Sequence, residues 1–127
     1  MTINPVEDSM TITSALAQRV QTCLKGIAIS EELITYKELA DVLELMPPKT
    51  IHQLTEALEY LMKEDAKNER PFIAAFVISR GRNRLPARGF FELAQQVGRY
   101  DGDSSGPEAQ AFHTAEIVAA GRFWGSA

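Results

Sequence analysis

Apolar residues recur at helical spacing along most of the chain. The longest pattern begins near Thr50 and runs to about residue 70, and its other positions are polar, which predicts a long amphipathic helix. A second pattern predicts a helix over roughly 14–28, and shorter patterns predict helices over roughly 90–97 and 107–121. The apolar positions of the longest pattern are Ile51, Leu54, Ala57, Leu58, Leu61 and Met62.

In the first half of the chain, two pairs of residues have the spacing of a capping box, in which side chains at the N-cap and at the third helical position each accept a hydrogen bond from a backbone N–H group. Thr35 and Glu38 form the first pair, within and just after a short β-type segment at 34–36. They predict a helix that begins at the end of this segment and that the next Pro-Pro pair ends. Thr50 and Gln53 form the second pair and predict the start of the long helix.

Residues 72–79 are rich in aromatic and β-branched side chains and too few for a core helix, which predicts a buried strand. Glycine and proline then interrupt regular structure over residues 80–89. The order of elements matches a winged helix with extra C-terminal helices. We therefore expect a single, mostly helical α+β domain of winged-helix type over residues 13–127. A flexible N-terminal arm over residues 1–12 precedes it.

The composition is that of an ordinary globular protein. The 127 residues, 45% hydrophobic and 24% charged, are enough for one domain with a core. The start, MTINPVEDSM, lacks the basic and apolar segments of a signal peptide. The longest apolar run, residues 72–78, is shorter than the ~20 residues of a membrane helix. Cys23 is the only cysteine, which fits a reducing compartment. We expect a soluble, cytoplasmic protein without a membrane segment.

A group of arginines follows the predicted strand, although the chain as a whole is acidic. Its 13 basic and 17 acidic residues give a net charge of -4, so nucleic-acid binding would need a local basic patch. Guanidinium groups match phosphate oxygens, and several on one loop can follow a nucleic-acid backbone. The alternative is that these arginines pair with nearby carboxylates at the surface. The loop arginines are Arg80, Arg82, Arg84 and Arg88.

The long helix is the candidate recognition helix of such a scaffold. Only its first turn suits a DNA groove, because Glu56, Glu59 and Glu64 further along would face phosphates with the wrong charge. We therefore expect DNA contacts only from the arginine loop and from the residues around this first turn. Those residues are Lys49, Thr50, His52 and Gln53.

No group of residues has the spacing of a catalytic or metal site. The two histidines, His52 and His113, lie on separate predicted helices, and no Cys or His pair has zinc-ligand spacing. His113 and Glu116 lie close on one helix, and an acid/base pair is one interpretation of them. We expect no enzyme activity, no cofactor and no metal. An enzyme would need the arginine loop to hold an anionic substrate near Glu64, Asp65 or His113.

Two short motifs resemble a known family. ITYKELADVL, residues 34–43, resembles the strand-to-helix entry of the DNA-binding domain of alkylguanine alkyltransferases and alkyltransferase-like proteins, which commonly reads TTYGE-hydrophobic-A. HQLTEAL, residues 52–58, resembles the start of their recognition helix, R-x-hydrophobic-G-x-A-L. In that family the following strand carries a P-C-H-R active-site segment, where this chain reads AAFVISR. The resemblance covers roughly residues 34–80 and implies a winged-helix fold.

The chain departs from this family at the positions that carry its chemistry. The family's nucleotide-flipping arginine falls on His52, and its recognition-helix glycine falls on Thr55. The active-site cysteine is absent, since Cys23 lies in the first predicted helix. The resemblance therefore implies the scaffold and argues against alkyl transfer. Residues 71–99 also resemble uncharacterised bacterial proteins in which an apolar strand leads into a basic L-P-x-x-G-F-F segment, a resemblance that implies no activity.

The order of elements, and the contrast between the basic loop and the otherwise acidic chain, together predict a non-catalytic nucleic-acid-binding protein. Its expected role is regulatory or accessory, and its expected ligand is double-stranded DNA. The alternative is a protein-protein interaction module on the same scaffold, without nucleic-acid binding. The acidic outer face of the long helix suits that role, and Phe123 and Trp124 would then anchor the interface. The sequence leaves the oligomeric state and any protein partner open.

Overall fold

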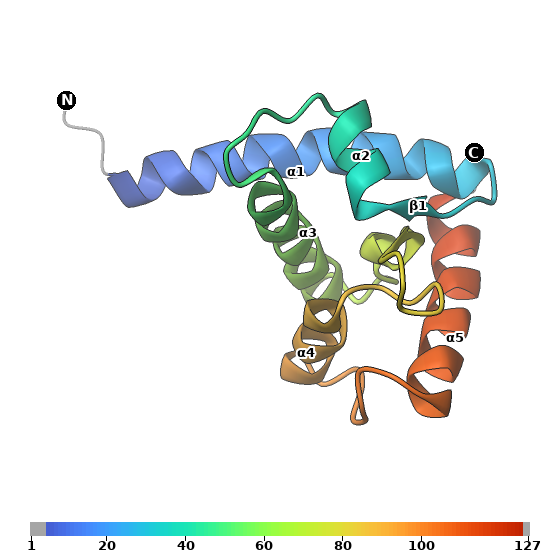
Figure 1. Ribbon diagram of the computed structural model, residues 1–127. Coiled ribbons are helices and arrows are strands. Elements are labelled where there is room, and N and C mark those ends of the chain that lie inside the picture. Colours follow the sequence, from blue (N-terminus) through green and yellow to red (C-terminus); the bar gives the residue numbers. More distant parts are fainter. Residues whose placement is uncertain (1–4, 126–127) are drawn as a thin grey trace.

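The computed structural model describes the backbone of residues 5–125 and the side chains of residues 12–125. In this range the chain is mostly helical with one small parallel sheet, which is an α+β fold (Figure 1). The elements in chain order are α1 (Pro5–Ile29), β1 (Ile34–Thr35), α2 (Tyr36–Val42), α3 (Thr50–Lys67), the 3-10 helix η1 (Ile73–Phe76), β2 (Val77–Ile78), α4 (Arg88–Gln96) and α5 (Pro107–Trp124).

Helix α1 is longer than the sequence pattern indicates. It begins at Pro5, whereas we expected a flexible arm up to residue 12. Residues 5–12 are helical, and the rest of the expected arm, residues 1–4, lies outside the described range. Proline fits the first turn of a helix because its φ is already helical and its missing N–H needs no partner there. The apolar period of α1 does not extend into residues 5–12, so it does not reveal these turns. Among the described residues, no helix has the length and apolar composition of a membrane span.

The start of α2 confirms the first capping box. Thr35 is the N-cap, and its Oγ1 accepts a hydrogen bond from the Glu38 N–H at 3.1 Å. The Thr35 N–H donates in return to Glu38 Oε1 at 3.0 Å. The helix ends at Val42, before the Pro-Pro pair, because Glu44 takes a positive φ of 54° and turns the chain out of the helix.

Helix α3 confirms the long amphipathic helix but not the second capping box. Its N-cap is Lys49, in a left-handed conformation with φ 61°, and no side chain caps it. Thr50 is instead the first helical residue. The Gln53 side-chain amide donates to the carbonyls of Pro48 at 3.1 Å and Met46 at 3.4 Å. Gln53 therefore fixes the incoming loop. Ile51, expected in the core, is 48% exposed.

The strand expected over residues 72–79 is mostly a different structure. Residues 73–76 form η1, and only β2 is a strand, paired in parallel with β1 in the register Ile34↔Val77 and Thr35↔Ile78. The expected burial is confirmed from Phe72 to Ile78. The N–H and C=O groups of a strand form hydrogen bonds with neighbouring strands. In this segment, side chains of α3 and α5 form hydrogen bonds with the backbone instead.

Four side chains from two helices bind the backbone of residues 71–75. Figure 1 shows this segment between α3 and α5. Asp65 Oδ2 accepts from the Ile73 N–H at 3.0 Å, and Glu116 Oε2 accepts from the Phe72 N–H at 2.9 Å. His113 Nε2–H donates to the Ala75 carbonyl at 2.8 Å. The Trp124 indole N–H donates to the Pro71 carbonyl at 2.9 Å. These bonds fix η1 at the centre of the molecule.

An aromatic cluster joins α4 and α5 to this centre. The Phe90 ring makes edge-to-face contacts with Phe72, at 5.8 Å between ring centroids, and with Phe91, at 5.2 Å. Tyr100 packs against Phe112 of α5 at 4.7 Å. Such pairs add to the stabilisation from burial alone. They hold α4, and with it the end of the arginine loop, against the body of the protein.

Candidate nucleic-acid interface

The loop between β2 and α4 is folded into consecutive turns. The Ser79 N–H donates to the Leu85 carbonyl at 2.8 Å, the Arg82 N–H to Ser79 at 3.3 Å, and the Leu85 N–H to Arg82 at 3.0 Å. Gly81 takes a positive φ of 86°, which favours glycine at this turn. Leu85 and Pro86 are buried beneath the turns. The backbone of this loop therefore has a defined conformation.

Arg82 fastens this loop to the rest of the protein. Its Nε donates to the Pro86 carbonyl at 3.0 Å, and its Nη2 donates to the Ser104 carbonyl. On the other side of the loop, the Ala87 N–H donates to the Tyr36 hydroxyl at 3.0 Å. The expectation that Arg82 contacts phosphate does not fit this geometry, because both of its bonded groups serve backbone carbonyls. Arg82 is a positioning residue for the loop.

The other three loop arginines are exposed. No carboxylate of the described residues lies within 4.0 Å of the guanidinium groups of Arg80, Arg84 or Arg88. The Arg80 charge acts on Glu38, whose pKa is lowered chiefly by hydrogen bonds from Thr35 and also by Arg80. Among the described residues, the loop arginines therefore form no carboxylate ion pair within 4.0 Å, and Arg80 acts on Glu38 without such a pair.

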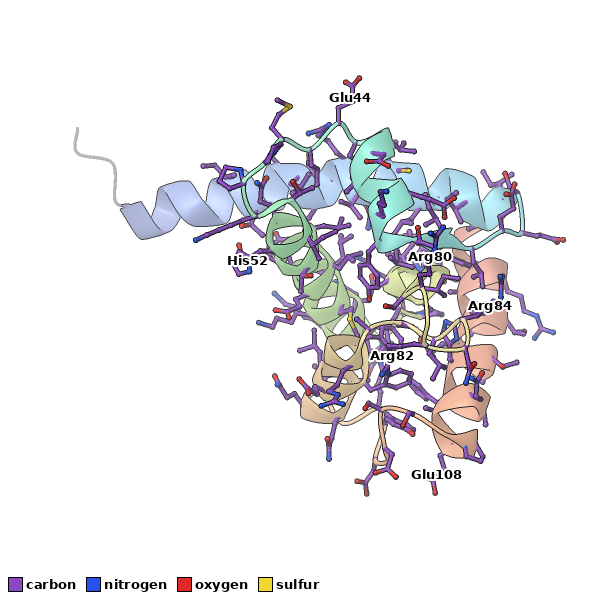
Figure 2. All side chains as sticks on the ribbon, viewed as in Figure 1. Glu44, His52, Arg80, Arg82, Arg84 and Glu108 are labelled. Carbon is purple, nitrogen blue, oxygen red and sulfur yellow. The ribbon has the colours of Figure 1, made fainter. Side chains whose placement is uncertain are left out.

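The residues around the first turn of α3 do not join the arginines in one continuous surface. In Figure 2, Arg80 lies beside β1, Arg84 lies on the side of the loop toward α5 and Arg82 lies below both, whereas His52 projects from the side of α3 that faces away from the loop. His52 also binds Glu56 at 2.6 Å. Lys49 is exposed, and Thr50 is half-buried. The predicted site residues thus form two separate groups.

A small apolar recess lies between these groups. It encloses about 80 Å³ between α3 and the start of α4. Burial raises the pKa of the Tyr36 hydroxyl at its wall, so this group stays neutral. No pattern in the sequence reveals the recess, because its walls come from four separate segments of the chain. The lining residues are Tyr36, Thr55, Leu58, Glu59, Met62, Ala74, Ala87, Gly89 and Phe90.

The polar groups considered for catalysis are engaged in the core. His113 and Glu116 each bind a backbone group near η1, and burial lowers the pKa of His113. Asp65 is completely buried, binds Arg70 Nε at 2.6 Å, and has a pKa raised by burial. Its position on the apolar stripe of α3, one turn after Leu61, is the one sequence signal for this role.

Within the described residues, no three metal-ligating side chains gather in one place. Comparison of the chain with protein-family models, with curated proteins and with solved structures finds no match. Function is therefore inferred from the geometry and charge of the surface itself.

Proposed function

We propose that this protein binds nucleic acid, with double-stranded DNA as the preferred form, through phosphate contacts from the arginine loop and without catalysing a reaction. One observation carries the proposal. Arg80, Arg84 and Arg88 are exposed, and no carboxylate of the described residues forms an ion pair with them within 4.0 Å, on a loop that Arg82 fixes to the body. Exposed guanidinium groups on a fixed backbone suit phosphate, because less conformational freedom is lost on binding.

The scaffold and the charged residues of α3 around the loop determine which other contacts the DNA can make. The element order is compatible with a winged-helix-like scaffold, in which a loop of this kind lies along the backbone of the duplex. Lys49 belongs to the separate group at the start of α3, so it would reach a phosphate only farther along the duplex, whereas Glu56 and Glu59 keep the rest of α3 away from phosphates. Binding then depends on backbone contacts, so it is weakly selective for sequence and strongly dependent on salt.

A titration of a labelled duplex at low salt, followed by fluorescence anisotropy, tests this function. With about three phosphate contacts, the logarithm of the association constant should fall with the logarithm of salt concentration with a slope of about -3. The double variant Arg80→Glu/Arg84→Glu should bind at least about tenfold more weakly than the wild type. The matched control is Lys63→Glu/Lys67→Glu, which makes the same charge change at the exposed far end of α3.

Two results would overturn the proposal. One is the absence of binding at low salt. The other is an equal loss of affinity in both double variants, because that would show attraction to net charge alone. Arg82 is left unchanged in this test, since its substitution would disturb the loop itself.

A protein-interaction module is the second candidate, and the connection between α2 and α3 favours it. Val42 at the end of α2, Met46 in the connection and Ile51 in the first turn of α3 are 62%, 74% and 48% exposed. The connection is held in place, since Arg19 Nη2 donates to the Leu43 carbonyl at 2.6 Å and Gln53 binds two more carbonyls. Exposed apolar side chains on a fixed loop are typical of protein interfaces. A partner protein captured by both the wild type and Arg80→Glu/Arg84→Glu, but not by Met46→Gln/Ile51→Gln, would favour this candidate.

A further inference from the structure

Helix α5 presents an uncharged face to solvent over most of its length. Between Glu108 and Arg122 its only ionisable residues are His113 and Glu116. Both of these point inward to the backbone near η1. The outward positions of the same stretch carry only small, apolar or hydroxyl side chains. A helix that is apolar on both sides normally packs against other protein surfaces on both sides. These exposed positions are Ala111, Thr114, Ala115 and Val118.

A shallow groove follows this outer face from Gln110 to Arg122. It continues into a hollow of about 810 Å³ between α5, the end of α1 and Arg84, and Val118 and Arg122 line both. Ile29 in this hollow is 64% exposed, and Phe123 on the last turn of α5 is 51% exposed. The uncharged face therefore ends at a hollow of mixed character, in which Ile29 and Val118 lie beside the charged residues Glu31, Glu32 and Arg84.

We propose that a second copy of this chain covers this face, with the two α5 helices packed antiparallel about a two-fold axis near Ala115. The exposed positions 108, 111, 115, 118 and 122 alternate three and four residues apart, which is the spacing of a helix-pairing seam. Small side chains along such a seam allow the helix axes to approach within about 8 Å.

Charge at the two ends of the seam selects the antiparallel arrangement. Glu108 lies in the first turn of α5 and Arg122 in the last, and they are equally far from Ala115 along the helix. An antiparallel pair places Glu108 of each copy beside Arg122 of the other, at both ends at once. It also aligns the two helix dipoles favourably. A parallel pair would place like charges together.

The same arrangement explains why the occupant is a copy of this chain. A two-fold interface uses one surface patch twice, so the patch must complement itself. The outer face of α5 meets this condition, because its centre carries only small or apolar uncharged side chains and its two ends are opposite in charge. The seam from 108 to 122 is only about 21 Å long. We therefore expect a weak dimer, with a dissociation constant in roughly the micromolar range.

Sedimentation velocity of the full chain over a range of concentrations tests the dimer. The wild type should shift from monomer to dimer as concentration rises. Ala115→Glu should stay monomeric, because it places two carboxylates at the axis, and its glutamate is well tolerated in an exposed helix. Ala15→Glu, on an exposed position of α1, is the matched control and should dimerise like the wild type. Circular dichroism of each variant confirms that the helices are retained.

Charge reversal tests the antiparallel register separately. Glu108→Arg alone and Arg122→Glu alone should each weaken the dimer by about tenfold or more, because each puts like charges at both ends. The double variant Glu108→Arg/Arg122→Glu should restore the wild-type dissociation constant. A monomer at every concentration, a dimer that survives Ala115→Glu, or a double variant no tighter than the single ones would overturn the proposal. None of these results depends on nucleic-acid binding.

Discussion

Three ionisable side chains, the buried Asp65 and His113 and the half-buried Glu116, form hydrogen bonds with the backbone near η1. Asp65 and Glu116 accept from the N–H groups of Ile73 and Phe72, and His113 donates to the carbonyl of Ala75. A buried backbone group without a partner costs as much as a lost hydrogen bond. A short 3-10 helix leaves such groups unpaired at its ends. These side chains therefore make possible an irregular segment inside the core.

His113 should make the stability of the protein depend on pH. Burial lowers its pKa in the folded state, while in the unfolded chain the pKa is near 6.5. Below about pH 6.5 the unfolded chain takes up a proton that the folded protein does not, so stability is lost as pH falls through this range. The loss is at most about 1.4 kcal/mol per pH unit for one group.

The variant His113→Gln isolates this effect. Its amide can still donate to the Ala75 carbonyl, so we expect a cost of about 1 kcal/mol at pH 7.5. Denaturant unfolding at pH 7.5 and at pH 5 should show that the difference between wild type and variant shrinks on acidification. The raised pKa of Asp65 has the opposite effect, because its contribution to the free energy of unfolding grows as pH falls. Wild type and variant both contain Asp65, so this contribution cancels in the difference between them. A constant difference across this range would contradict the assignment.

The sequence reveals the candidate residues of the loop but not what each of them does. Arg80 and Arg82 have the same side chain and lie two residues apart, yet Arg80 is exposed and Arg82 binds the carbonyl of Ser104. That difference depends on a carbonyl from a remote segment of the chain, and no local pattern marks it. The inward orientation of His113 and Glu116 is hidden for the same reason.

At the scale of elements, the two capping-box pairs offer a direct comparison. Both have the same spacing, but Thr35 caps α2 and Thr50 lies inside α3 without a capping bond. Thr35→Ala should therefore lower the free energy of unfolding by about 1 kcal/mol. Thr50→Ala should change it by less than about 0.5 kcal/mol. Denaturant titrations of the two variants at neutral pH check the difference, and equal losses would show that the assigned caps are wrong.

Helices with a clear apolar period are predicted well from this sequence, as α3 shows, because the period reports directly which face is buried. The structure of residues 72–79 is not predicted correctly, because a short apolar run has the same composition in a strand and in a buried 3-10 turn. The side chains that decide between the two, Asp65 and Glu116, come from other helices. The start of α1 is missed because its first turns lie outside the apolar period.

At the scale of the whole molecule, the end of α5 closes the fold. The Trp124 ring lies between Arg70, whose guanidinium is 5.1 Å from the ring centroid, and Lys25 of α1, whose ammonium is 5.7 Å away. Gly125 follows so close to the Ala28 carbonyl of α1 that a Cβ would lie 3.0 Å from its oxygen. Trp124 thus docks on the body of the protein, while Phe123 is exposed beside it. Of the two residues expected at an interface, only Phe123 is positioned to contact a partner.

This closure predicts that α5 unfolds together with the rest of the protein. Trp124 is the only tryptophan, so its fluorescence reports the docking of the last turn of α5 alone. Its indole N–H binds the Pro71 carbonyl next to η1, the segment that α1, α3 and α5 all contact. Loss of that contact exposes the shared core, and small domains of this size unfold cooperatively. Fluorescence and far-ultraviolet circular dichroism should therefore give the same denaturant midpoint. A fluorescence transition at clearly lower denaturant would mean that α5 detaches from a core that remains folded without it.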